Sequence, residues 1–272
     1  MFKHQTHEDL ASEYSKSISW IQQQIYSYKV AEKTHNPRAI NLVCDTTFYG
    51  KRKDHLGTVV FYDAIEHEVI LWKHVESEKS QYYKQLLNEL LILGYSINAV
   101  TLDGRRGLNT VFKAYPIQMC HFHQKQIVQR YTTKNPKSEA GKDLQKVMYA
   151  LTKSSEECFK NKLQNWRSKH ETYLSEMTVN KETRRSTYTH QKLRSGYSSL
   201  ASNLEYLFTY NRLKEFNIPN TTNHLDGGLF SDLKNRIRVH RGLSRANKKK
   251  MVDYYMLNSG KKNTKIDPRF YL

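Results

Sequence analysis

Cysteine is scarce in this sequence, and long apolar runs are missing from it. The 272 residues include three cysteines, Cys44, Cys120 and Cys158, which argues against a disulfide framework and favours a reducing compartment. No stretch approaches the roughly 18 apolar residues of a membrane-spanning helix. The opening residues, MFKHQTHEDL, lack the apolar segment of a secretory signal. We therefore expect a soluble cytoplasmic protein that does not insert into a membrane.

Acidic residues are few relative to basic ones. The chain holds 44 lysines and arginines against 26 aspartates and glutamates, a formal net charge of +18. The segment 231–272 holds 12 basic residues against 3 acidic ones, so it carries +9, half of the total. Hydrophobic residues make up 38% of the sequence, which is typical of a folded chain. Because neutralising phosphates releases condensed counterions, this excess predicts a nucleic-acid partner.

Residues 39–131 alternate between β-rich and helix-forming runs. Three β-rich runs separated by polar links predict an antiparallel meander, and Gly94 closes the first helical run as a C-cap would. The predicted order is strands at 39–50, 55–65 and 68–75, a helix at 80–95, a strand at 97–104, a helix at 108–116, a strand at 117–123 and a helix at 123–131. This order predicts an α/β fold with a mixed five-stranded sheet, in which the last two strands run parallel to the first.

The composition divides the chain further. Residues 138–215 are polar, helical and dotted with aromatics, without a clear strand, and we interpret them as an all-helical insertion into the α/β core. The predicted organisation is an N-terminal segment at 1–35, the first part of the core at 36–137, the insertion at 138–215, and the final helix with a basic tail at 216–272.

The N-terminal segment has the outline of the last two helices of a helix-turn-helix. Thr6 can cap the first helix, with Asp9 at the capping-box position, and isoleucines at helical spacing follow in a second one. Gln22 and Gln23 are then free to face a DNA groove. The alternative is an amphipathic hairpin that only packs on the core.

Two aspartates end apolar strands of the predicted core. Asp45 follows Leu42-Val43-Cys44, and Asp103 follows Ala99-Val100-Thr101-Leu102. Burying a carboxylate is costly unless it is paired or binds a cation. Neighbouring strands would bring both carboxylates to one edge of the sheet, where they suit Mg²⁺. Either residue alone could be a simple turn former or helix cap.

A third acidic ligand must come from further along the chain. Asp226 is the best candidate, because it opens a helix whose later turns are basic and could line DNA; the alternative is an ordinary N-terminal helix aspartate favoured by the macrodipole. Glu205, within the insertion, and Asp232, later on the basic helix, are weaker competitors. The basic residues of that helix are Lys234, Arg236 and Arg238.

Cys120 and His123 stand in a Cys-x-x-His spacing that invites a zinc interpretation. Structural zinc needs four ligands, and no second cysteine–histidine pair lies nearby. A structural role or a polar contact with DNA is therefore favoured for both residues.

These motifs together resemble the Mutator-like DDE transposases of bacterial insertion sequences, in particular a variant group with an N-terminal zinc ribbon and helix-turn-helix. The resemblance covers about residues 5–255. It rests on Cys44-Asp45-Thr46-Thr47, Leu102-Asp103-Gly104, Cys120 with His123, Thr221-Thr222-Asn223 before Asp226-Gly227, and His240-Arg241-Gly242-Leu243-Ser244.

The resemblance implies an RNase H-like fold and a triad of Asp45, Asp103 and Asp226 that binds two Mg²⁺ or Mn²⁺ ions. The implied partner is double-stranded DNA, cut and rejoined at the terminal inverted repeats and the target. It also implies a homo-oligomer on DNA in the bacterial nucleoid, with His240 and Arg241 among the DNA contacts.

The chain departs from the family pattern in two places. The third acidic position is usually glutamate, and an aspartate retracts the carboxylate by one methylene, about 1.5 Å. The zinc ribbon is absent, so the sequence resembles an N-terminally shortened or split member. Two alternatives therefore stay open beside an active transposase: a decayed or repurposed DNA-binding protein, and a stand-alone nuclease of the same fold.

Overall fold

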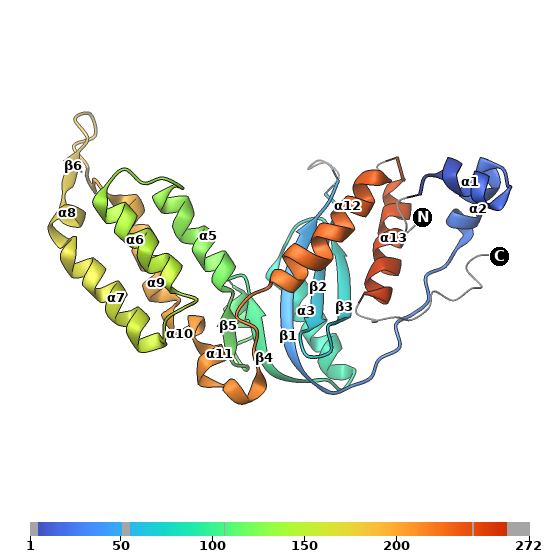
Figure 1. Ribbon diagram of the computed structural model, residues 1–272, viewed down its shortest axis with the longest axis horizontal. Coiled ribbons are helices and arrows are strands. Elements are labelled where there is room, and N and C mark those ends of the chain that lie inside the picture. The colour runs from blue at the N-terminus through green and yellow to red at the C-terminus, as the bar shows by residue number, and fades with distance from the viewer. Residues whose placement is uncertain (1–4, 51–54, 106, 241, 260–272) are drawn as a thin grey trace. The chain divides into compact units, whose positions relative to one another are not determined.

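The computed structural model describes residues 5–50, 55–105, 107–240 and 242–259, and most of its elements are labelled in Figure 1. The strands are β1 (Ala39–Phe48), β2 (Gly57–Asp63), β3 (Glu68–Val75), β4 (Ser96–Leu102), β5 (Ile117–Met119), β6 (Met177–Val179) and β7 (Ser186–Tyr188). The helices up to the end of the insertion are α1 (His7–Tyr14), α2 (Ile18–Ser27), α3 (Ser80–Ile92), α4 (Leu108–Val111), α5 (His121–Thr132), α6 (Glu139–Ala150), α7 (Glu156–Lys169), α8 (Glu171–Ser175), α9 (Gln191–Ser202), α10 (Leu204–Leu207), α11 (Thr209–Arg212) and the 3₁₀ turn η2 (Lys214–Phe216). The last three are the π-helix η3 (His224–Phe230), α12 (Ser231–Val239) and α13 (Arg245–Asn258).

The predicted α/β fold is confirmed. Five strands form a mixed sheet in the order β3-β2-β1-β4-β5, with helices beside it and a mostly helical region after it, an arrangement consistent with an RNase H-like fold. The meander β1-β2-β3 is antiparallel, whereas β4 and β5 are parallel, with Val100 opposite Ile117. A parallel pair needs a crossover connection, and the segment that contains α4 provides it.

The chain divides into two compact units, and the first comprises residues 1–98 and 223–272. One face of its β-meander packs against η3, α12 and α13, through a buried cluster that includes Val43, Val60, Phe230 and Val252. On the other face, α3 contacts β2 and β3, and the ring of Tyr83 lies against that of Phe61. Because both faces of the meander are covered, β2 is buried along its whole length. A strand covered on both faces has a mostly continuous apolar sequence rather than an alternating one.

The second unit, residues 99–222, is largely helical. Its core joins α5, α6, α7, α9 and α10 around Leu144, Phe159, Trp166 and Phe208. The indole Nε1 of Trp166 donates to the carbonyl oxygen of Ala140 over 2.9 Å, so the one polar atom of this buried ring is satisfied.

The structure corrects the prediction of an insertion without strands. β6 and β7 form a two-stranded antiparallel sheet within residues 138–215. Each strand has three residues, all exposed, so neither carries the apolar alternation by which a strand is recognised. Two helices also differ from their predicted bounds. The helix predicted at 108–116 ends at Val111, and the helix predicted at 123–131 begins at His121.

The N-terminal helices α1 and α2 follow the predicted pattern. Thr6 and Asp9 form the expected capping box, in which each side chain binds the other residue's backbone N–H. The Nζ of Lys250 on α13 donates to the carbonyl oxygens of Ile25 and Tyr26 at the end of α2. Whether this hairpin meets DNA stays a prediction, as does the division into four segments. Among the described helices, none has the length and apolar character needed to cross a membrane.

Candidate metal centre

Asp45 is a buried carboxylate on the central strand of the sheet. It lies directly opposite Val60 of β2 and two residues after Val43. Both positions share its face of the sheet, and both valines belong to the cluster under η3 and α12. Asp45 is 6% exposed, and its Oδ1 accepts a hydrogen bond from the N–H of Thr46 over 2.7 Å. The prediction that Asp45 ends its strand is wrong in detail, because pairing with β2 continues to Phe48.

Asp226 belongs to η3, a π-helical turn that runs directly into α12. Leu225 and Phe230 are both buried against the same face of the sheet that carries Asp45. They are five residues apart, the i→i+5 spacing of π-helical hydrogen bonds, so packing on the sheet holds the widened turn in place. Such turns are frequent at functional sites. The Asp226 side chain is half-buried, and the two glycines after it are exposed.

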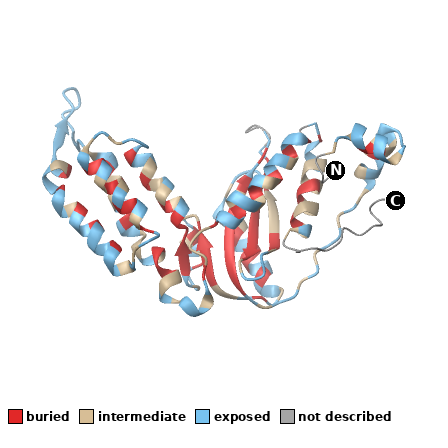
Figure 2. Ribbon diagram, viewed as in Figure 1, coloured by how far each residue is buried: buried red, intermediate tan, exposed pale blue. Residues whose placement is uncertain are grey.

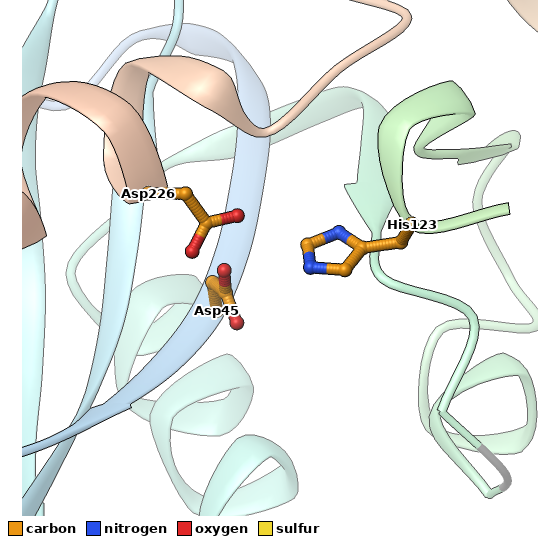
Figure 3. Close-up of side chains that lie close together, drawn as sticks. All are labelled: Asp45, His123 and Asp226. Carbon is orange, nitrogen blue, oxygen red and sulfur yellow. The ribbon is translucent and has the colours of Figure 1, made fainter. Parts of the chain in front are cut away.

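The carboxylates of Asp45 and Asp226 come together within the first unit. One carboxylate oxygen of Asp45 lies within 4.8 Å of one of Asp226 (Figure 3). Carboxylate oxygens suit Mg²⁺ and Mn²⁺. Two carboxylates repel each other at this separation unless a cation lies between them. The group therefore has the chemistry to hold a divalent metal ion.

Two consecutive hydrogen bonds link Thr46 of β1 to Tyr83 of α3 and to Glu78 just before that helix. The hydroxyls of Thr46 and Tyr83 lie 2.8 Å apart, and the Tyr83 hydroxyl donates to Glu78 over 2.6 Å. Burial raises the pKa of Tyr83 far above its usual value, and the negative charge of Glu78 raises it further. Tyr83 thus stays protonated and serves as a permanent donor beside the strand that carries Asp45.

Cys120 is fully buried at the N-cap of α5, where it joins the start of that helix to Thr222. The N–H and hydroxyl of Thr222 lie 3.3 and 3.5 Å from the Cys120 sulfur, and the same hydroxyl lies 3.3 Å from Nδ1 of His123. Burial acts to raise the pKa of the Cys120 thiol, but hydrogen bonds from His123 and Thr222 bring it down to about 7. These contacts tie the start of α5 to Thr222, and both roles predicted for Cys120, a structural one and a contact with DNA, stay predictions.

The remaining predicted acids lie elsewhere. Asp103 follows β4 directly and is half-buried, and its Oδ1 accepts from the N–H of Arg105 over 2.9 Å. Among the described residues it is not part of the group around Asp45, so its role as a ligand stays a prediction. Asp232 accepts from Arg236 and from the Tyr255 hydroxyl, which ties α12 to α13. Glu205 is exposed in the second unit.

The residues predicted to contact DNA differ in the exposure of their side chains and in whether these form ion pairs. Lys234 and Arg238 are exposed and one helical turn apart on α12, so they share a face. Arg236 is half-buried and engaged with Asp232. His240 is buried, Gln22 is half-buried and Gln23 is exposed, whereas Arg241 lies outside the described residues. Contact with DNA stays a prediction for all of them.

His123 lies in the first turn of α5, in the second unit. The Cys-x-x-His spacing led to a structural role or a DNA contact being favoured over zinc for this residue. Its Nδ1 lies 3.3 Å from the Thr222 hydroxyl, and its contact with DNA stays a prediction. In comparisons with known proteins, no protein-family model matches this chain, and no curated protein matches it either.

Proposed function

We propose that this protein is a DNA transposase of the Mutator-like DDE type, which cleaves phosphodiester bonds at the ends of an insertion sequence and joins them to target DNA. The observation that carries the proposal is the pairing of a buried carboxylate, Asp45, with Asp226 from a distant segment. A globular protein seldom brings two carboxylates together on the apolar face of a sheet without a cation to bind. The net charge of +18 supplies the affinity for DNA.

In this proposal each acidic side chain has a defined task. Asp45 and Asp226 would hold a divalent ion, Mg²⁺ or Mn²⁺, and Asp103 would add a third carboxylate ligand. Divalent ions bound there would supply Lewis acidity at the attacking and leaving oxygens of an in-line displacement. Lys234 and Arg238 on the exposed face of α12 would bind the phosphates on either side of the reacting one.

The glycines that follow Asp226 suggest where the DNA backbone passes. A Cβ atom at Gly227 or Gly228 would meet nothing within 4 Å, and neither residue has a positive φ. Neither protein packing nor backbone conformation thus requires glycine here, although glycine in a helix costs about 0.5–1 kcal/mol relative to alanine. We attribute the missing side chains to close approach of the substrate backbone to Asp226.

This attribution predicts opposite effects on stability and activity. Gly227→Ala and Gly228→Ala should each raise the free energy of unfolding by about 0.5 kcal/mol. Both should weaken DNA cleavage, and Gly227→Leu should weaken it further, because a larger side chain blocks the approach more. Denaturant unfolding and cleavage rates measure the two effects. Unchanged cleavage by Gly227→Leu would show that no substrate passes there.

The proposed function is tested by incubating the protein with duplexes that carry the element's terminal inverted repeats and with a target plasmid. Mg²⁺ or Mn²⁺ should produce cleavage at the repeat ends and covalent joining to the plasmid, and a chelator should abolish both. Salt-sensitive DNA binding without metal-dependent cleavage would identify a decayed transposase that only binds DNA. Cleavage that ignores the repeats and never joins strands would identify a stand-alone nuclease instead.

A further inference from the structure

The β6–β7 hairpin of the second unit is exposed along its whole length. Every residue from Ser175 to Thr189 is exposed, and Figure 2 shows the hairpin in the colour of exposed residues throughout. The pairing runs from Met177 opposite Tyr188 to Val179 opposite Ser186. A lone two-stranded hairpin is marginally stable in water, so other contacts must hold this one in shape.

The tip of the hairpin is shaped by its own backbone. The side-chain oxygen of Asn180 accepts from the N–H groups of Glu182 and Thr183, each over 2.9 Å. The Asn180 carbonyl accepts from Arg184, which has a φ of 53°, and the Asn180 N–H donates to Arg185. An asparagine that caps its own turn is a common way to fix a loop. The tip is therefore a defined structure that needs no packing partner.

The base of the hairpin is anchored to α8 and α9 by ring stacking. The rings of Tyr173 and His190 are stacked with centroids 3.6 Å apart, and His190 also contacts Glu176 over 2.8 Å. The Arg194 guanidinium lies 3.6 Å from the centre of the Tyr188 ring and donates to the carbonyl oxygen of Leu174. These contacts join the hairpin to the helical unit and hold its tip away from the helices' core.

The tip carries unpaired positive charge. Lys181, Arg184 and Arg185 are exposed, as is Lys192 at the start of α9, against Glu182 as the single acid of the tip. Within the described part of the chain, none of these four cations forms an ion pair. On α7 of the same unit, by contrast, Lys169 is engaged with Glu139 and Asp143.

We propose that the β6–β7 hairpin is a DNA-binding arm, whose tip binds the phosphates of duplex DNA through Lys181, Arg184 and Arg185. The major groove admits a two-stranded ribbon, and cations without acidic partners bind polyanions by releasing counterions. The inference rests on the proposed function only in taking DNA as the partner. A protein partner, seated on the exposed side chains of Met177 and Val179, is the competing occupant.

The test measures how DNA affinity of the full chain depends on salt, in buffer without divalent ions. A variant with Lys181→Ala, Arg184→Ala and Arg185→Ala should bind a plain duplex less tightly than wild type. Each phosphate contact contributes about 0.9 to the slope of log affinity against log salt, so the slope should become shallower by about 2 to 3. The matched control changes the same charge on α6 and α7 through Lys142→Ala, Lys160→Ala and Lys162→Ala, all exposed, and should leave the slope close to that of wild type.

The possible outcomes separate this inference from the proposed function. If wild type binds no DNA at all, the proposed function fails as a whole. If wild type binds but both triple variants show the same slope, the DNA-binding arm is overturned while the proposed function stands. An unchanged slope together with self-association that Met177→Ser and Val179→Ser abolish would assign the hairpin to a protein interface instead.

Discussion

Asp45→Asn is expected to reduce divalent-dependent DNA cleavage by about a thousandfold, about 4 kcal/mol of activation free energy. The substitution keeps the size of the side chain and an oxygen that can accept from Thr46, but it removes the charge that attracts a cation. Binding of DNA without divalent ions should change little, because Asp45 is buried. Rates of cleavage at saturating DNA, compared at several Mn²⁺ concentrations, measure the effect.

Asp226→Asn and Asp232→Asn form the matched pair for this experiment. Both aspartates lie in the η3–α12 segment, but Asp232 is tied to Arg236 and Tyr255. Asp226→Asn should lose activity as severely as Asp45→Asn, whereas Asp232→Asn should keep most of it. The reverse result would move the downstream ligand from Asp226 to Asp232. Full activity in Asp45→Asn would remove this site from the reaction altogether.

The second large effect is on the free energy of unfolding. Repulsion between the two carboxylates lowers it, and a metal ion bound between them raises it. Two carboxylates within 4.8 Å repel each other by about 3 kcal/mol at an effective dielectric constant near 20. In a chelating buffer, Asp45→Asn should therefore raise the free energy of unfolding. Added Mn²⁺ at about 100 times its dissociation constant should stabilise wild type by about 2.7 kcal/mol and leave the variant almost unchanged. Thermal or denaturant unfolding with and without metal measures both shifts.

The control for this experiment is Glu89→Gln, which removes an exposed carboxylate on α3. It should respond to Mn²⁺ as wild type does and should gain no stability in the chelator. A wild-type protein with no metal-dependent stabilisation would count against a metal site. So would an Asp45→Asn protein that gains as much from Mn²⁺ as wild type.

Much of the α/β core could be predicted because its signals are local. The antiparallel meander follows from three runs rich in β-branched and aromatic residues, and Gly94 takes the positive φ of 90° expected after a helix. Asp45 was identifiable because a carboxylate inside an apolar run needs a partner. The pairing of Val100 with Ile117 shows that the fourth and fifth strands are parallel to each other. That both run parallel to the first strand stays a prediction.

The features that could not be predicted depend on tertiary contacts or on very short elements. The π-helical turn at Asp226 exists because Leu225 and Phe230 both bury their side chains against the sheet. A helical pattern alone does not distinguish it from an ordinary turn. The β6–β7 hairpin lacks apolar alternation, since its residues are exposed on both faces.

A crystal structure of the protein soaked in Mn²⁺, with anomalous scattering used to locate the ion, tests the metal centre most directly. An anomalous peak is expected within bonding distance of carboxylate oxygens of both Asp45 and Asp226, and it should be lost in Asp45→Asn crystals. No peak between these carboxylates at saturating Mn²⁺, with both side chains ordered, would contradict a metal centre and with it the proposed chemistry.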